Sequence, residues 1–392
     1  MERINEVLTR GVAEIFPTKE GLAKLLAQKK IILYQGFDPS MPSLHLGNLV
    51  GLMKLRQFQK LGHKVIFLVG DFTGMIGDPT DKLATRKKLS REEVLENAKS
   101  WKNQASKILD FTGTNAAKIL FNSQWNDKVS FKDLIETTSN FTVQQMLERD
   151  MYQERLQEGK PIHLHEFLYP VAQAIDCVEM DVDLEIGGSD QIFNMLAGRT
   201  LMKAVKHKEK FVLATKLLVD KEGNKVGKTT GNALFLDSTA KDFFAGVMSF
   251  PDETISLGFE LLTEVSLNHI EERIKKNPML EKKRLAFEIV KLLWDEKIAA
   301  EAQGSFESTF QKKEIPKDIK TIFVKEPSLK LLDLVFATRE VPSRSEAKRL
   351  ISQNAIEIES KIYTNPAKDI KIPQSGIVIR IGKRIFIKIK NK

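Results

Sequence analysis

The chain has 392 residues, of which 42% are hydrophobic and 29% charged, and its formal net charge is +9. This length predicts two or three domains, and the composition is typical of a globular protein with a sizeable core. No run of about 18 apolar residues is present, so no membrane span is expected, and a single cysteine, Cys177, excludes an internal disulfide and a cysteine-based zinc cluster. Because the first residues are mixed in charge and lack the apolar core of a signal peptide, we expect a cytoplasmic protein.

Residues 1 to about 235 alternate between apolar strands and helices, which predicts an α/β fold with a doubly wound (Rossmann-like) parallel sheet. A helix is expected over 44–61, another begins at Ser90 with a capping box that Glu93 completes, and a helical insertion is expected near 126–160. Ligands of such sheets bind at the carboxyl ends of the strands. The predicted strands cover 31–37, 65–70, 118–121, 183–186 and 211–219.

The rest of the chain changes character twice. The pattern is helical from about 236 to 311, and a lysine-rich connection over 312–325 leads to a final segment, 326–392, in which isoleucines alternate with polar residues at strand spacing. From Arg339 to Lys392 there are 13 Lys/Arg and 5 Asp/Glu residues, a net charge of +8, so nearly all of the excess positive charge lies there. A folded basic module of this kind is typical of proteins that bind a polyanion such as RNA.

The segment after the strand 31–37 points to a nucleotide. A proline-punctuated turn leads into a helix that we expect to open at Ser43, and His45 and Asn48, three residues apart, share one face of it. A helix N-terminus carries unpaired amides and partial positive charge, which attract phosphate, and Gly47 lets a flat base or ribose approach the backbone. A histidine in this place is more often a cap or a packing residue, so the segment alone is ambiguous.

A second signature removes much of that ambiguity. Lys225-Val226-Gly227-Lys228-Thr229 lies about 180 residues after His45. The sequence His-Leu-Gly-Asn, followed at this distance by Lys-x-Gly-Lys-Thr, resembles the paired signatures of class I aminoacyl-tRNA synthetases.

A polar stripe on an apolar helix narrows the resemblance further. Tyr169, Gln173 and Asp176 fall at i, i+4 and i+7, which places them on one side of the helix, facing either water or a pocket. This pattern, with the motifs around Tyr34, Asp78 and Gln191, resembles the bacterial-type tyrosyl-tRNA synthetases over essentially the whole chain. The run that starts at Ser343 resembles their C-terminal S4-like RNA-binding domain.

The resemblance implies domain boundaries and roles. It implies a catalytic domain over 1–235, a helical tRNA (anticodon)-binding domain over 236–311, a linker over 312–325 and an S4-like domain over 326–392. Tyr34 and Asp176 would contact the phenolic hydroxyl of L-tyrosine, and Gln191 its carboxylate side. The residues implied for the ammonium group are Asp78, Tyr169 and Gln173.

For ATP, the resemblance assigns Ser40 and His45 to the γ-phosphate end and Asn48 and Asp190 to the ribose. The residues whose backbone would approach the nucleotide are Gly36, Asp38, Gly47 and Gly188. Lys82 and Arg86 would close over the pyrophosphate together with Lys225 and Lys228. These four and His45 form the implied catalytic set, and Mg²⁺ would accompany the ATP phosphates.

The implied partners are tRNA(Tyr), L-tyrosine, ATP and a second copy of the chain, joined through the 126–160 region, with no role for DNA or a membrane. His163 and His165 alternate before the stripe but lack a third ligand, so no metal site is expected. Gln35 stands where many relatives have a smaller residue, which leaves its contact with ribose open. The implied tRNA contacts are Arg344, Lys348, Arg349, Lys383 and Arg384.

Two alternatives remain open at this point. A tryptophanyl-tRNA synthetase shares the fold and the first signature, although the Tyr169 stripe and the basic module favour tyrosine. A non-catalytic RNA-binding relative of the synthetases is the second alternative, and the intact lysines and carboxylates argue against it.

Overall fold

The computed structural model describes residues 2–78, 89–226, 233–308, 319–359, 361–382 and 385–391. The chain divides into two compact units, Met1–Ala300 and Glu301–Lys392. Within the described ranges, no helix has both the length and the apolar character that crossing a membrane requires.

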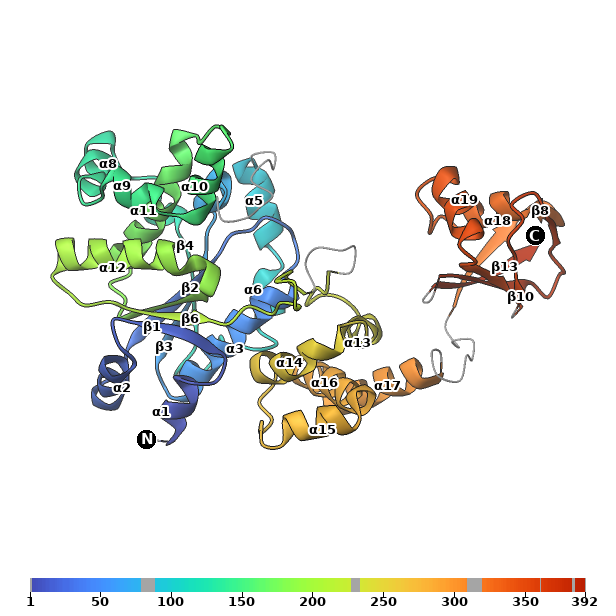
Figure 1. The fold of residues 1–392 in the computed structure, drawn as a ribbon, viewed down its shortest axis with the longest axis horizontal. Helices are drawn as coiled ribbons and strands as arrows, with labels where there is room; N and C mark the ends of the chain where they lie inside the picture. Colours follow the sequence, from blue (N-terminus) through green and yellow to red (C-terminus); the bar gives the residue numbers. More distant parts are fainter. Residues whose placement is uncertain are drawn as a thin grey trace. The chain divides into compact units, whose positions relative to one another are not determined.

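The first unit is built on a six-stranded sheet in the order β1-β6-β5-β2-β3-β4 (Figure 1). Neighbouring strands from β6 to β4 are parallel, whereas β1 pairs antiparallel with β6 at the edge. The predicted doubly wound parallel fold is confirmed, and β1 is the strand that the sequence pattern missed, because it is short and only partly buried. The strands are β1 (Val12–Phe16), β2 (Ile32–Phe37), β3 (Lys64–Val69), β4 (Lys118–Phe121), β5 (Leu184–Gly188) and β6 (Phe211–Thr215).

The strand order reverses direction at β2. The chain moves outward from β2 to β3 and β4, and then returns so that β5 pairs with the other side of β2, where Tyr34 lies beside Glu185. Open α/β sheets bind their ligands outside the carboxyl ends of the two strands at such a reversal. The fold therefore predicts a site above the ends of β2 and β5.

Helices cover both faces of this sheet, with α11 and α12 on one side and α3 on the other (Figure 1). The stretch between β4 and α11, where a helical insertion is expected, contains α8, α9 and α10. The helices are α1 (Glu2–Val7), α2 (Lys19–Gln28), α3 (Leu46–Lys60), α4 (Thr73–Ile76), α5 (Arg91–Ala98), α6 (Trp101–Ala105), α7 (Ser123–Asn126), α8 (Phe131–Thr138), α9 (Val143–Leu147), α10 (Asp150–Gln157), α11 (Leu164–Glu179) and α12 (Ile192–Lys206).

Local sequence explains where these helices begin. Ser90 caps α5, and Glu93 returns the bond to the Ser90 amide, so the predicted capping box is confirmed. The helix expected to open at Ser43 begins instead at Leu46, because His45 takes the N-cap position.

The end of β6 also differs from the prediction. The expected strand over 211–219 stops at Thr215, and Val219 pairs instead with Lys225 in a small hairpin whose turn includes Gly223 at φ 81°. The positive φ favours glycine in that turn.

The predicted helical segment, 236–311, belongs for the most part to the same unit. Arg10, which precedes β1, donates hydrogen bonds to the carbonyl oxygens of Phe259, Glu260, Thr263 and Val265 at the end of α14. The described part of this segment contains helices and no strand. They are α13 (Ala240–Met248), α14 (Ile255–Leu262), α15 (Ile270–Lys276), α16 (Pro278–Leu293) and α17 (Glu296–Phe306).

The second unit holds a five-stranded sheet in the order β10-β9-β12-β13-β7 and a two-stranded sheet of β8 and β11. The predicted isoleucine strands are confirmed, since alternate isoleucines of β9, β12 and β13 form its buried core, although Ile362 is 55% exposed. The elements are β7 (Lys320–Val324), β8 (Ser328–Lys330), α18 (Leu331–Ala337), α19 (Arg344–Ser352), β9 (Ile356–Ile358), β10 (Lys361–Ile362), β11 (Asp369–Lys371), β12 (Ile377–Ile381) and β13 (Ile385–Asn391).

Part of the expected connection is not a linker. Residues Lys320–Val324 form β7, which pairs in parallel with β13 and so belongs to the second unit. The lysine-rich composition of 312–325 concealed this strand, because β7 is at the sheet edge and most of its side chains are not buried.

Candidate active site

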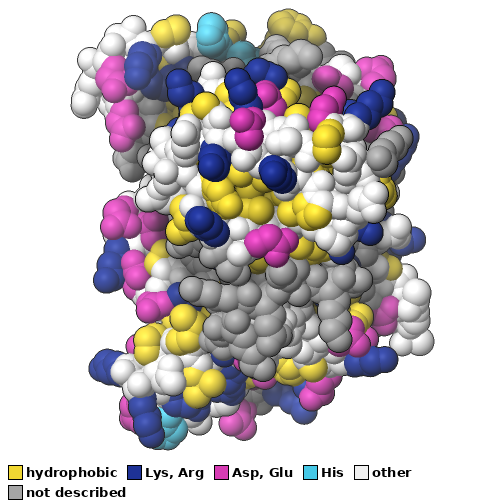
Figure 2. Space-filling model, turned by 90° about the vertical axis from the view of Figure 1, so that its right-hand side faces the viewer, with side chains coloured by type: hydrophobic (Ala, Val, Ile, Leu, Met, Phe, Trp, Pro, Cys, Tyr) yellow, Lys and Arg dark blue, Asp and Glu magenta, His cyan; other side chains and the backbone are white. Residues whose placement is uncertain are grey.

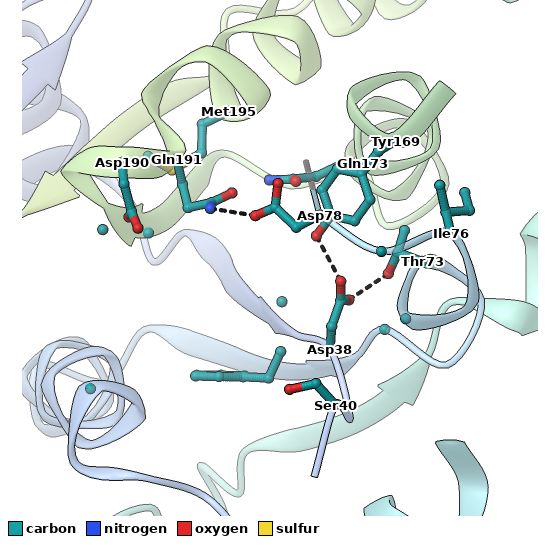
Figure 3. A pocket seen from close by; sticks show the side chains of 18 of the residues that line it. Asp38, Ser40, Thr73, Ile76, Asp78, Tyr169, Gln173, Asp190, Gln191 and Met195 are labelled. Carbon is teal, nitrogen blue, oxygen red and sulfur yellow. Dashed lines mark hydrogen bonds between the residues drawn. The ribbon is translucent and has the colours of Figure 1, made fainter. Parts of the chain in front are cut away.

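A pocket of about 1270 Å³ opens where the strand order reverses, at the carboxyl ends of β2 and β5. Its walls come from β2, the start of α3, α4, α11, and the turn between β5 and α12 (Figure 3). All described residues that the sequence assigned to tyrosine and ATP line this pocket. They are Tyr34, Gly36, Asp38, Ser40, His45, Gly47, Asn48, Asp78, Tyr169, Gln173, Asp176, Gly188, Asp190, Gln191 and Lys225.

The polar stripe of α11 faces this pocket rather than the solvent. Tyr169, Gln173 and Asp176 line the pocket, while the neighbouring Val171 and Ala174 are buried against the protein. The helix therefore packs through its apolar sides and presents its polar side to the cavity.

Asp176 is held by three donors. Trp125 Nε1 and Asn126 Nδ2 donate to Asp176 Oδ1 at 2.7 and 2.9 Å, and Asn122 Nδ2 donates to Oδ2 at 3.1 Å. The side chain is 2% exposed. Burial raises the pKa of Asp176 to about 8, although these hydrogen bonds favour the carboxylate.

Asp38 anchors Tyr169 from the opposite wall. Tyr169 Oη donates to Asp38 Oδ2 at 2.7 Å, and Thr73 Oγ1 donates to Asp38 Oδ1 at 2.6 Å (Figure 3). Burial raises the pKa of Asp38 to about 7, while the two hydroxyl donors lower it. Asp38 thus contributes its carboxylate to the site, in addition to the backbone role that the sequence suggested.

Asp78 and Gln191 meet across the pocket. Gln191 Nε2 donates to Asp78 Oδ2 at 2.7 Å (Figure 3). Gln191 Oε1 accepts from Asn194 Nδ2 of α12 at 2.8 Å. The second bond fixes which end of the Gln191 amide faces Asp78.

At the floor of the pocket, the Tyr34 hydroxyl donates to Glu185 Oε1 at 2.6 Å and lies 3.1 Å from Cys177 Sγ. Gln173 Nε2 donates to the same Glu185 oxygen at 2.8 Å. Burial raises the pKa of Tyr34 well above its usual value, and its neighbours Cys177 and Glu185 raise it further.

The part of the pocket that the sequence assigns to the nucleotide begins at the N-terminus of α3. His45 Nδ1 accepts from the Asn48 amide at 3.3 Å, and Asn48 Oδ1 accepts from the His45 amide at 2.9 Å. His45 is thus both a helix cap and a pocket residue. A Cβ on Gly47 would lie 2.9 Å from the His45 ring, so the glycine makes room for that ring.

The side chain of Gln35 lies against α3. A Cβ on Gly51 would fall 2.2 Å from Gln35 Oε1, which is buried without a hydrogen-bond partner. The larger residue at position 35 is therefore accommodated by a glycine on the facing helix.

Lys225 and Asp190 form an ion pair, with 2.6 Å between Lys225 Nζ and Asp190 Oδ2. Asp190 follows Gly188 in the turn after β5, and a Cβ on Gly188 would lie 2.5 Å from Asp190 Oδ1. Lys225, the first lysine of the second signature, thus lines the same pocket as Asp190. Lys82, Arg86 and Lys228 lie outside the described residues.

The histidine pair at the start of α11 has a structural role. His163 is the N-cap of α11 and Glu166 completes the capping box, with the His163 and His165 rings 5.8 Å apart. In the described parts of the chain, no group of three or more His, Cys, Asp or Glu residues is placed to hold a metal ion.

Three of the implied tRNA contacts, Arg344, Lys348 and Arg349, lie on α19 of the second unit. Arg344 pairs with Asp333 at 2.8 Å, Arg349 donates to Glu346 at 2.8 Å, and Lys348 is exposed. Lys383 and Arg384 lie outside the described residues.

The surface of this unit combines positive charge with apolar side chains. Figure 2 shows one face of the whole molecule, on which Lys and Arg side chains lie around a group of hydrophobic ones. Among the described residues of this unit, the exposed large hydrophobic side chains are Phe323, Phe336 and Ile362.

Sequence reasoning missed several residues that hold the site. Glu185 left a signal, because it is a charged residue inside an otherwise apolar central strand, whereas Asn122 and Trp125 left none. Cys177, expected to be a small buried hydrophobe, is buried but lies within hydrogen-bonding distance of Tyr34.

The chain resembles known proteins over most of its length. Residues 26–311 match the family model described as class I tRNA synthetases (W and Y). The Tyrosine–tRNA ligase of Aquifex aeolicus is 40% identical over 98% of this chain and 97% of its own length. That of Idiomarina loihiensis is 41% identical, over 99% of this chain and 98% of its own. In fold, a C-terminally truncated mitochondrial tyrosyl-tRNA synthetase from Coccidioides posadasii matches 77% of this chain and 91% of its own, with a TM-score of 0.64 and 24% identity.

Proposed function

The chain belongs to the class I tRNA synthetase family of the tryptophan and tyrosine enzymes, and we propose that it is a tyrosine–tRNA ligase. It activates L-tyrosine with ATP, releases pyrophosphate and then transfers tyrosine to the 3′ end of tRNA(Tyr). The observation that carries the proposal is Asp176, a carboxylate held by Trp125, Asn122 and Asn126 at the floor of a pocket that also holds the capped helix of His45.

The tyrosine pocket binds the substrate at both ends. Asp176 and Tyr34 receive the phenolic hydroxyl, and a substrate without that hydroxyl leaves buried polar groups unpaired, which penalises phenylalanine. Asp78, Tyr169 and Gln173 receive the ammonium group. Gln191, fixed by Asn194, supports the carboxylate side.

Activation requires no covalent nucleophile on the protein. A carboxylate oxygen of tyrosine attacks the α-phosphorus of ATP, a new P–O bond forms, and the bond to the pyrophosphate oxygen breaks. His45 and the amides at the start of α3 stabilise the phosphates, and Lys225, once it leaves Asp190, stabilises the departing pyrophosphate. Ser40 and Asn48 complete this half of the site, and Gly36 and Gly188 let the nucleotide approach the backbone.

Residues outside the described ranges complete the proposal. Lys82, Arg86 and Lys228 act with Lys225 on the pyrophosphate, and Mg²⁺ enters as part of the ATP substrate, without a ligand assigned from the chain. Arg344, Lys348 and Arg349 of α19, together with Lys383 and Arg384, contact tRNA phosphates. The proposal includes a homodimer joined through 126–160 and a cytoplasmic location, where the protein meets tRNA.

The deciding experiment is ATP–pyrophosphate exchange by the full chain with each amino acid supplied separately. Exchange that depends on tyrosine, and not on tryptophan or phenylalanine, supports the proposal. Exchange that depends on tryptophan would assign the chain to the other branch of the family. A well-folded chain that binds tRNA without any exchange would identify it as an RNA-binding relative.

A further inference from the structure

A buried polar cluster lies beneath the tyrosine half of the pocket, and the proposed reaction does not use all of it. We call Glu185, Lys210, Cys177, Tyr34 and Gln173 the Glu185 cluster. Tyr34 and Gln173 belong to the pocket, whereas Lys210 is 0% exposed and forms an ion pair with Glu185, which is 1% exposed. A charged pair at this depth needs strong compensation, so its position calls for an explanation.

Each acceptor site of the Glu185 carboxylate has a donor. Oε1 accepts from Tyr34 Oη at 2.6 Å and from Gln173 Nε2 at 2.8 Å. Oε2 accepts from Lys210 Nζ and from Cys177 Sγ at 3.4 Å. A carboxylate offers about four acceptor sites, so this one is saturated on the protein side.

The fold makes room for the lysine. Lys210 Nζ also donates to the Met195 carbonyl oxygen at 2.9 Å, and a Cβ on Gly198 of α12 would lie 2.8 Å from that nitrogen and 2.5 Å from Cys177 Sγ. Burial alone would lower the pKa of the Lys210 ammonium, but its neighbours Cys177 and Glu185 raise that pKa above its usual value. Lys210 therefore stays charged and pairs with Glu185 as its counter-ion.

An ionised carboxylate can only accept, and this fixes the polarity of both pocket residues. Tyr34 has one proton and gives it to Glu185, so its oxygen faces the pocket as an acceptor. Gln173 gives its NH₂ group to Glu185, which leaves its carbonyl oxygen for the pocket. The ammonium group of L-tyrosine is a donor and matches the Gln173 carbonyl oxygen, and the phenol, which has a single proton, can donate it either to Tyr34 or to Asp176.

We propose that Glu185 and Lys210 are positioning residues that determine tyrosine specificity by orienting the hydrogen-bond polarity of Tyr34 and Gln173. This inference rests on the proposed function. Neither residue reacts: Glu185 acts through Tyr34 and Gln173, and Lys210 acts through Glu185.

The test is the E185Q/K210M variant, assayed by pyrophosphate exchange. E185Q alone would leave Lys210 buried without a counter-charge and risks misfolding, whereas the double variant leaves no unpaired charge. A neutral glutamine in place of Glu185 can present either its carbonyl oxygen or its NH₂ group, so the polarity of Tyr34 and Gln173 is no longer fixed. The KM for tyrosine should rise on the order of 10-fold, equivalent to about 1.4 kcal/mol, with kcat and the KM for ATP within about twofold.

The selectivity for tyrosine over phenylalanine provides a second measurement. It would not change if the Glu185–Lys210 ion pair only stabilised the fold. The preference for tyrosine over phenylalanine should fall in E185Q/K210M, and the same change in a Tyr34→Phe background should reduce it much less, because the effect passes through Tyr34. The matched control is K29M/D183N. Asp183 is two residues before Glu185 in the chain and forms an ion pair with Lys29 at 2.8 Å, but it does not line the pocket. That control should lose stability without a change in the KM for tyrosine.

A double variant that melts cooperatively and keeps the wild-type KM and selectivity would overturn the inference while the wild type stays active. A wild-type chain without tyrosine-dependent exchange would overturn the proposed function itself, and the inference with it.

Discussion

Lys225 Nζ lies 2.6 Å from Asp190 Oδ2, so the first lysine of the second signature is paired with the carboxylate proposed to receive the ribose of ATP. Lys225 lies on the small hairpin that its pairing with Val219 closes. Asp190 lies in the short turn that follows β5. Under the proposed mechanism, ATP must replace this ion pair, so the ribose takes Asp190 and the pyrophosphate takes Lys225. The exchange of partners would couple nucleotide entry to the placement of the lysine.

Lys225→Ala should lower the rate of tyrosyl-adenylate formation on the order of 100-fold, since the lost charge stabilises the pyrophosphate mainly in the transition state. Equilibrium binding of tyrosine should change by less than about twofold, because Lys225 belongs to the nucleotide half of the site. Pre-steady-state exchange and tyrosine titration measure the two quantities. Lys221→Ala, an exposed lysine of the same hairpin, is the control and should leave both unchanged. A loss of tyrosine affinity at an unchanged activation rate would contradict the role given to Lys225.

Asp176→Asn should reduce kcat/KM for tyrosine by roughly 10- to 100-fold, because one carboxyl oxygen becomes an NH₂ group, which cannot accept from the phenol or from the Trp125, Asn126 and Asn122 donors. Tyr34→Phe should cost only about 0.5–1.5 kcal/mol as a neutral bond, and it should mainly weaken the preference for tyrosine over phenylalanine. Glu179→Gln, exposed on the same helix, controls for general effects on α11. Near-normal tyrosine kinetics in Asp176→Asn would show that this carboxylate does not read the phenol.

Asp38 predicts a pH dependence of stability. Its pKa is about 7 in the folded protein against 3.8 for an ordinary aspartate, so between these values the folded state binds more protons than the unfolded state. The contribution of Asp38 to the free energy of unfolding is therefore fully present below about pH 4 and is lost as the pH rises through 7. The free energy of unfolding falls by at most about 1.4 kcal/mol per pH unit over this range. Asp38→Asn should remove that slope, because its uncharged amide does not titrate.

Thermal melts of the free protein between pH 5 and 8 measure this difference. Asp176 has a pKa of about 8 and contributes a slope of the same sign, so the comparison is between wild type and Asp38→Asn rather than with a flat line. Parallel curves for the two proteins would mean that Asp38 is already ionised at pH 5.

Gly51→Ala should have two separate effects, one on the stability of α3 and one on the position of the Gln35 side chain. A Cβ on Gly51 would fall 2.2 Å from Gln35 Oε1, the far end of a flexible side chain that loses no hydrogen bond there when it moves. Alanine should therefore raise stability by up to about 1 kcal/mol in α3. The displaced amide moves into the nucleotide half of the pocket, so the KM for ATP should rise while the KM for tyrosine stays the same.

Gly304→Ala in α17 is the matched control, since a Cβ there has no neighbour within 4 Å and reports helix propensity alone. An unchanged KM for ATP in Gly51→Ala would show that Gln35 can move without entering the nucleotide site.

The parts of this structure that sequence could predict follow from periodicity and short-range chemistry. The parallel strands, the Ser90 capping box and the isoleucine strands of the second unit each have a local pattern, and each is confirmed. The edge strands β1 and β7 were missed because half-exposed residues carry little apolar signal.

The residues that hold the side chains of the site in place were harder to predict, for a different reason. Asp176 is held by Asn122 and Asn126, about fifty residues earlier in the chain, and Glu185 is neutralised by Lys210, which precedes the next strand. Such pairs depend on which strands become neighbours, and a single sequence does not encode that neighbourhood in its local spacing.

The two compact units predict that the two half-reactions can be separated. The pocket lies wholly between Tyr34 and Val226, within the unit Met1–Ala300, so a chain that ends at Ser308 keeps every described residue of the site. This truncation precedes β7, which belongs to the second unit through its pairing with β13. Tyrosine-dependent pyrophosphate exchange should therefore persist, and transfer to tRNA should fall steeply with the loss of the basic module.

The salt dependence of tRNA binding tests the reason for that loss. Each phosphate contact removed should lower the slope of log K against log salt by roughly 0.7–0.9, so the truncated chain should show a flatter line than the full chain. R344Q/K348Q/R349Q in the full chain is the sharper variant, because it removes charge from α19 and leaves the buried isoleucine core in place. It should flatten the line partway, without affecting exchange. Full aminoacylation by the truncated chain, with an unchanged salt slope, would show that tRNA is held by the first unit alone.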